Sequence, residues 1–187
     1  MKLKKINAVL SLLAVLTLLI HIGYSAFAYF TFYYNPALKT LTSLPFIVVV
    51  CLHAICGMCA VFLQSDGARL DVYRKQNMGT FLQRVSAALI FPLLIVHLKT
   101  FTLLQSSAAG GQWGMFGLLL CLQVAFYLIV FVHVAVSFSK AWITLGLLTD
   151  RDKQKRLDRL AYILCAVLFV VTATAVVRGQ LLMFLPK

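Results

Sequence analysis

Five long apolar segments dominate the sequence and constrain what this chain can fold into. A helix that crosses the hydrocarbon core of a bilayer needs about 20 apolar residues, and each segment is long enough to supply them. The chain is 62% hydrophobic and only 12% charged, with a mean hydropathy of +0.95, which excludes an ordinary soluble domain. We therefore predict an all-α polytopic membrane protein with one five-helix bundle domain over residues 1–187. Its transmembrane helices are expected near residues 6–33, 44–63, 85–104, 115–148 and 160–185.

The beginning of the chain has some features of a secretory signal peptide. Lys2, Lys4 and Lys5 precede the first apolar segment, and the tripeptide Ala-Phe-Ala at 26–28 looks like a cleavage site. The apolar core of a signal peptide is only about 7–15 residues long, whereas this segment is much longer. We therefore expect an uncleaved first transmembrane helix.

The charged residues lie on alternate sides of the predicted spans. Basic side chains precede the first span, and they also fill the connections 64–84 and 149–159, which hold all five acids as well. The positive-inside rule places these segments in the cytoplasm, so the N-terminus is expected inside and the C-terminus outside a bacterial cytoplasmic membrane. The net charge of +12 is thus a topology signal, not a nucleic-acid signal. The acids are Asp66, Asp71, Asp150, Asp152 and Asp158, and the chain has no glutamate.

The connections between the spans are short. We expect a surface helix within 64–84, a flexible outer loop at 106–114 and a second outer connection at 35–45. Pro45 is expected in the first turn of the second span, and Pro92 should kink the third. No connection is long enough for a catalytic domain, so any soluble chemistry belongs to a partner chain that docks on 64–84 and 149–159.

The cysteines favour packing over redox chemistry. Cys56 and Cys59 match the C-x-x-C pattern, but all five cysteines fall inside predicted spans, with no nearby cation to activate a thiol. We interpret them as small core residues, which argues against a thiol oxidoreductase.

The four histidines lie one in each of the first four spans, at His21, His53, His97 and His133. Ionisable groups at membrane depth are rare and usually mark a site, and imidazole binds haem iron, zinc and copper. With a rise of 1.5 Å per residue from the predicted cytoplasmic ends, His21 and His97 lie roughly 23 and 18 Å up, and His53 and His133 roughly 15 and 10–15 Å up. Two pairs at two depths favour two bis-histidine haems over a single zinc, which needs its ligands at one level.

The residues near the histidines fit a bulky, anionic cofactor. Small residues follow His21, His53 and His133 at helical spacing, although small residues also serve ordinary helix packing in lipid. Cations suited to haem propionates lie at both depths, and their alternative role is to reach the lipid headgroups. The small residues are Ser25, Ala28, Cys56, Gly57, Ala60 and Ser137, and the cations are Arg84, Lys99, Lys140 and Arg178.

Two short motifs add a resemblance to this pattern. The sequence SLPF followed by HAICG, around His53, and the sequence FLQRVSAALIFPLLIVHLKTF, which ends after His97, resemble the second and third helices of a known family. Together with the histidine layout, they make the chain similar to the five-helix dihaem cytochrome b anchor of succinate dehydrogenases and fumarate reductases. Ala87 stands where that family often has glycine, and the glutamates that some relatives use near the outer haem have no counterpart here.

The resemblance implies a complete electron-transfer unit. It pairs His21 with His97 on an outer haem b and His53 with His133 on an inner one. It also implies a flavoprotein subunit, an iron–sulfur subunit on the cytoplasmic side, and a quinone, with menaquinone the best match. Candidate quinone-site residues within the spans are Tyr24, Ser25, Tyr29, Ser86 and Arg84.

Two other functions stay open from the sequence. The cytochrome b subunit of a hydrogenase or formate dehydrogenase also carries several intramembrane histidines, although one histidine on each of four successive helices fits it less well. A small transporter or anchor without haem is an alternative from another class. A b-type absorption band in the purified protein distinguishes the cytochromes from the colourless alternative.

Overall fold

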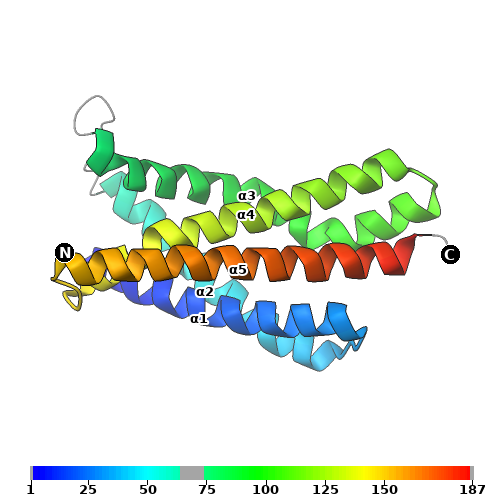
Figure 1. Ribbon diagram of the computed structural model, residues 1–187, viewed down its shortest axis with the longest axis horizontal. Helices are drawn as coiled ribbons and strands as arrows, with labels where there is room; N and C mark the ends of the chain where they lie inside the picture. The colour runs from blue at the N-terminus through cyan, green and yellow to red at the C-terminus, as the bar shows by residue number, and fades with distance from the viewer. Residues whose placement is uncertain (1, 64–73, 186–187) are drawn as a thin grey trace.

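The computed structural model describes residues 2–63 and 74–185, and every regular element in these ranges is an α-helix. Each helix contains a stretch that is long and apolar enough to cross a membrane, which confirms the prediction of an all-α fold with five candidate spans. Helices α1, α3 and α5 begin at one end of the bundle, called here the basic end, and the other end is called the far end (Figure 1). The helices are α1 (Lys2–Thr31), α2 (Pro36–Leu63), α3 (Arg74–Ala109), α4 (Trp113–Leu145) and α5 (Arg151–Phe184).

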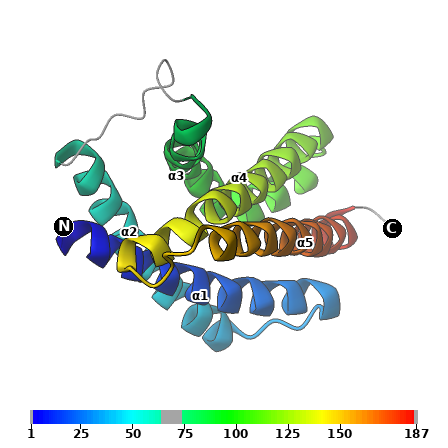
Figure 2. The ribbon, with the colours of Figure 1, turned by 60° about the vertical axis from the view of Figure 1, so that its left-hand side comes forward.

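The bundle is built from two helical hairpins and a fifth helix. The α1–α2 and α3–α4 hairpins meet through α1 and α4, and α5 packs against both of these central helices (Figures 1 and 2). Among the described residues, α2 packs against α1 alone, and α3 packs mainly against α4 with a minor contact to α5. Helices α2 and α3 therefore flank the bundle and do not pack against each other.

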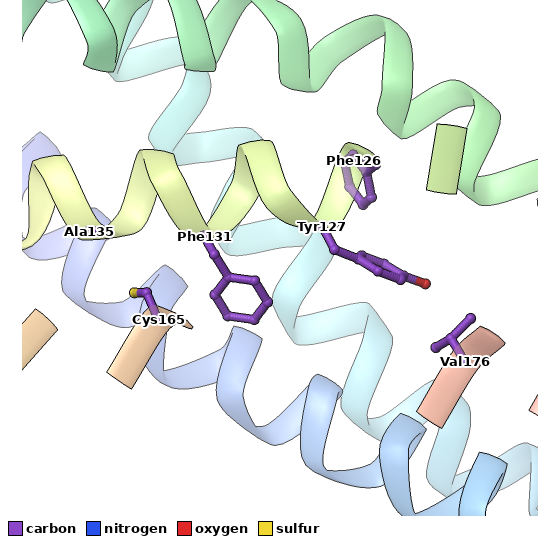
Figure 3. Close-up of a cluster of buried hydrophobic side chains, with 6 residues drawn as sticks. All are labelled: Phe126, Tyr127, Phe131, Ala135, Cys165 and Val176. Carbon is purple, nitrogen blue, oxygen red and sulfur yellow. The ribbon is translucent and has the colours of Figure 1, made fainter. Parts of the chain in front are cut away.

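The buried core lies between α4 and α5. Phe126, Tyr127, Phe131 and Ala135 of α4 gather with two residues of α5, Cys165 and Val176 (Figure 3). Most other large apolar side chains are exposed, and no residue of α2 is buried. An apolar exterior of this extent suits contact with lipid and is unlike the surface of a soluble domain.

Helix α2 begins at Pro36, eight residues before the predicted start. The Asn35 side-chain oxygen accepts hydrogen bonds from the Ala37 and Leu38 amides at 2.9 and 3.2 Å, and proline at the next position has no amide hydrogen to satisfy. The connection expected at 35–45 is thus almost entirely helical. Pro45 lies inside α2, so its predicted place in the first turn is wrong.

Helix α5 begins within the charged segment expected to be a loop. Asp150 caps it by accepting hydrogen bonds from the Lys153 and Asp152 amides, and these bonds hold the pKa of the Asp150 carboxyl below its usual value. Residues 151–159 are therefore helical.

The other connections also differ from the predicted ones. Helix α3 begins at Arg74, so the described part of the connection 64–84 belongs to this helix, and the rest of that connection lies outside the described residues. Helix α3 continues through Pro92 to Ala109. Only 110–112 separate it from α4, so most of the flexible connection expected at 106–114 is helical. Helix α4 ends three residues before the predicted boundary, where Gly146 adopts a left-handed conformation with φ 79°.

A close contact between α1 and α5 makes Gly179 sensitive to substitution. A Cβ atom at Gly179 would run into the Tyr29 ring, so we expect Gly179→Ala to lower the free energy of unfolding by about 1–3 kcal/mol. The control is Gly117→Ala in α4, where nothing lies within 4 Å and alanine should stabilise the helix by roughly 0.5–1 kcal/mol. Unfolding of both variants in detergent checks this, and equal effects would contradict the packing.

Candidate functional site

The four histidines lie half-buried on four different helices. His21 of α1 and His97 of α3 are close enough to interact electrostatically. The same holds for His53 of α2 and His133 of α4. The structure thus brings near each other the partners that helix counting placed at similar depths.

Aromatic contacts show how far apart the two histidine pairs lie along the bundle axis. The His21 ring stacks on Phe46 of α2 with centroids 5.5 Å apart, and the His97 ring stacks on Phe126 of α4 at 4.8 Å. Phe46 precedes His53 by seven residues, and Phe126 precedes His133 by seven residues. Seven helical residues span about 10 Å. The His21–His97 level therefore lies about 10 Å farther toward the far end than the His53–His133 level.

The helices that carry each pair do not pack against each other. Within residues 2–63 and 74–185, α1 does not pack against α3, and α2 does not pack against α4. Each pair joins one helix of the first hairpin to one helix of the second, whereas the hairpins themselves meet through α1 and α4. Direct helix packing therefore does not explain why the histidines of a pair lie within electrostatic range of each other.

His133 has a defined hydrogen-bonding arrangement. Its Nδ1 lies 3.0 Å from Ser86 Oγ and 3.2 Å from the Gln83 carbonyl oxygen. The Ser86 hydroxyl donates its one hydrogen to the Leu82 carbonyl at 2.7 Å, and a carbonyl can only accept. Nδ1 of His133 is therefore the donor, and a neutral ring then keeps its lone pair on Nε2, where a metal ion binds.

The other three histidines differ from His133. Nδ1 of His21, His53 and His97 is buried and has no hydrogen-bond partner among the described residues. A buried polar atom left without a partner costs about 1–3 kcal/mol, so buried polar atoms in folded proteins normally have one. The Nδ1 atoms of His21, His53 and His97 therefore differ from that of His133, and the His53 ring has the Asn7 main chain of α1 beside it.

The side chain of Asn7 in α1 lies beside Gly57, one turn after His53. It is 3.8 Å from the position that a Cβ atom of Gly57 would take, which is ordinary van der Waals contact, and the Asn7 main chain lies near the His53 ring. The predicted role of Gly57 beside a cofactor stays a prediction.

The four predicted cations fall into two groups. Lys140 Nζ donates to Gln83 Oε1 at 3.0 Å and lies within electrostatic range of Arg84, so both cations are near His133 at the basic end. Lys99 is exposed, and it follows His97 by two residues, which turns it away from that ring. Arg178 is also exposed and lies over the Phe30 ring at 6.0 Å. The structure therefore brings Arg84 and Lys140 near a histidine pair, whereas Lys99 and Arg178 occupy exposed faces.

The predicted quinone-site residues do not form one cluster. The Tyr24 hydroxyl both donates to the Asn35 carbonyl and accepts from the Asn35 amide, at 2.9 Å each, and so ties α1 to the start of α2. Ser86 contacts His133, and Ser25 lies half-buried one turn after His21. Tyr29 alone belongs to a second group of buried polar residues.

This second group is a cluster of two tyrosines and two glutamines, called here the Tyr–Gln cluster. Gln180 Nε2 donates to Tyr29 Oη at 3.3 Å, and Gln123 Nε2 donates to Tyr127 Oη at 2.7 Å. The two tyrosines are close enough to interact electrostatically, and the Tyr127 ring meets the His97 ring edge-on at 5.7 Å. The cluster therefore connects α1, α4 and α5 beside the His21–His97 level.

The Tyr–Gln cluster has unused hydrogen-bonding capacity. Gln180 and Gln123 are 0% and 4% exposed, and the side-chain oxygen of each has no partner among the described residues. Each of these amide oxygens can thus accept a hydrogen bond from a hydroxyl group of a bound molecule. Sequence reasoning missed Gln123, Gln180 and Tyr127 because it searched for ionisable groups, although a lone glutamine inside an apolar helix is a readable signal.

Comparisons with protein-family models, with curated proteins and with solved structures gave no match to this chain. Among the described residues, no three histidine, cysteine or acidic side chains gather to hold a metal ion. What the chain does must therefore be argued from the two histidine pairs and the Tyr–Gln cluster.

The hydrogen bonds of Tyr24 predict a structural role for its hydroxyl. Tyr24→Phe removes two hydrogen bonds and should lower the free energy of unfolding by about 1–3 kcal/mol. Tyr33→Phe is the control, because Tyr33 is exposed. Thermal unfolding in detergent checks this, and similar stabilities of the two variants would show that the Tyr24 hydroxyl does not hold the first hairpin together.

Proposed function

We propose that this chain is a dihaem cytochrome b that anchors a succinate dehydrogenase or fumarate reductase in the bacterial cytoplasmic membrane. It carries electrons between an iron–sulfur subunit and menaquinone or another quinone, while a flavoprotein subunit interconverts succinate and fumarate. The observation that carries this proposal is the pairing of four half-buried histidines at two levels, across helices that do not pack against each other.

The histidines fit haem iron as axial ligands. His21 and His97 would hold one iron, and His53 and His133 the other. The His133 tautomer leaves Nε2 available for iron, and its Nδ1 donates to oxygen atoms, as metal-bound histidines usually do. With two histidines to hold each iron, the chemistry that haem would supply here is one-electron transfer. Arg84 and Lys140 are near His133 and suit the propionates of the inner haem.

The basic end is the docking side in this proposal. The positive-inside rule places it in the cytoplasm, where the soluble subunits lie. The first turns of α5 present exposed charges there, including the ion pair of Lys155 with Asp152 at 3.1 Å. The N-terminus is then cytoplasmic and the C-terminus outside, and the inner histidine pair lies nearer the electron donor.

The alternatives are supported less well. One histidine on each of α1 to α4 matches the dihaem anchor better than the cytochrome b of a hydrogenase or formate dehydrogenase. A transporter without haem gives no reason for three half-buried histidines whose Nδ1 atoms have no hydrogen-bond partner within the described residues.

The Tyr–Gln cluster is the best-supported place for the quinone head group. A quinone carbonyl can accept from a tyrosine hydroxyl, and a quinol hydroxyl can donate to an amide oxygen. The edge-on contact of Tyr127 with His97 puts the cluster beside the outer histidine pair, where electrons reach the quinone.

The pairing of the histidines predicts which substitutions act alike. His53→Ala and His133→Ala should remove the same haem component, because alanine offers no lone pair to iron. His21→Ala and His97→Ala should remove the other. Haem content and redox titration of each variant in membranes measure this, and dye-linked turnover of the soluble subunits is the control that should persist. The pairing would be contradicted if His53→Ala and His97→Ala removed the same haem component and His133→Ala removed the other one.

The quinone assignment predicts a separation of stability from turnover at Gln180. Gln180→Met removes a buried unpartnered oxygen together with the hydrogen bond that Nε2 donates to Tyr29. These two effects on stability oppose each other, so stability should change little, while quinone-linked turnover should fall several-fold at unchanged haem content. Gln105→Met, at an exposed position of α3, is the control. Unchanged quinone turnover in Gln180→Met would remove the Tyr–Gln cluster from the quinone site.

A further inference from the structure

A set of polar contacts joins α3 to α4 at the basic end. It consists of Gln83 and Ser86 of α3 with His133 and Lys140 of α4, and is called here the inner clamp. Gln83 uses both of its oxygens, because its carbonyl accepts from His133 Nδ1 at 3.2 Å and its side-chain oxygen accepts from Lys140 Nζ at 3.0 Å. His133 and Lys140 are seven residues apart, so they lie on one face of α4 two turns apart. Gln83 thus bonds to α4 at two points.

Ser86 completes the inner clamp. It is 5% exposed, and its oxygen lies 3.0 Å from His133 Nδ1. Because its hydroxyl hydrogen is used within α3, Ser86 accepts from the ring and the imidazole hydrogen is shared between two oxygens. Among the described residues, Nδ1 of His21, His53 and His97 has no such acceptor. The inner clamp therefore distinguishes one histidine from the other three.

We propose that Ser86 and Gln83 are positioning residues that fix the His133 ring with Nε2 toward the metal and lower the midpoint potential of the haem that it binds. The inference rests on the proposed function. Hydrogen bonds from Nδ1 to oxygen make an imidazole more electron-rich and a stronger ligand. A stronger donor stabilises ferric over ferrous iron, which lowers the potential. Lys140 acts through Gln83, whose side chain it holds.

The direct test is a redox titration of Ser86→Ala in membranes. Loss of one acceptor should raise the midpoint potential of the component that His133→Ala removes, and should leave the other component unchanged. Ser86→Thr keeps a hydroxyl and should restore the wild-type potential. Haem content is measured in parallel, because wild-type protein without haem would refute the proposed function, whereas haem present with an unmoved potential would refute the inner clamp alone.

A matched control lies on the same helix. The Thr100 hydroxyl of α3 is 1% exposed and donates to the Val96 carbonyl at 2.7 Å, as Ser86 donates to Leu82, but within the described residues it bonds to no histidine. Thr100→Val should therefore leave both potentials unchanged. An equal shift in Thr100→Val and Ser86→Ala would overturn the inference, because the effect would then come from any lost hydroxyl in α3.

A second variant covers the case in which Ser86→Ala loses its haem. Ser86→Cys keeps the volume but offers a weaker acceptor, so it should retain the haem at a potential above that of the wild type. Retention of haem in Ser86→Thr with loss in Ser86→Ala supports the positioning role. A potential that falls or stays unchanged in the haem-loaded Ser86→Cys and Ser86→Ala variants would overturn the inference.

Discussion

The structure depends on the placement of four imidazoles inside an apolar bundle. Polar nitrogen atoms in such surroundings require partners, and the bundle supplies Nδ1 of only one ring, His133, with acceptors among the described residues. His21 and His97 stack on aromatic rings, and each of the four histidines lies within electrostatic range of a histidine from the opposite hairpin. The proposed haems would bind imidazole nitrogen from two sides and would so account for this arrangement.

The fold explains why the pairs occur where they do. Helices α1 and α4 form the central contact and each carries one histidine, while the flanking helices α2 and α3 carry the other two. Each pair therefore links a central helix to a flanking helix of the other hairpin. Helix α5 has no histidine, but it packs against the central helices α1 and α4 and contributes Gln180 to the Tyr–Gln cluster. Bis-histidine ligation would thus add a second link between the two hairpins, which pack directly against each other through α1 and α4.

Several parts of this account were readable from the sequence, and others were not. The apolar runs predicted the five helices, because a helix that crosses a membrane needs about 20 apolar residues and such runs can be counted in the sequence. The helix starts were missed because a hydropathy pattern does not register caps: Asn35 with Pro36 and Asp150 set the starts of α2 and α5 in polar segments. Counting residues placed the histidines at two depths, and their aromatic contacts also separate two levels along the bundle, while haem binding by the two pairs stays a prediction. The hydrogen bonds of three glutamines were not predictable, because Gln83, Gln123 and Gln180 carry no charge. Gln83 and Gln180 bond across helices, whereas Gln123 bonds to Tyr127 within α4.

The central claim is that each histidine pair holds one haem, and the haem stoichiometry of the purified chain tests it most directly. A pyridine haemochrome assay, with protein determined by amino-acid analysis, should give two b-type haems per chain. A value of two would match the two levels that lie about 10 Å apart along the bundle. One haem per chain would contradict the assignment of one of the pairs, and a colourless protein would contradict the whole account.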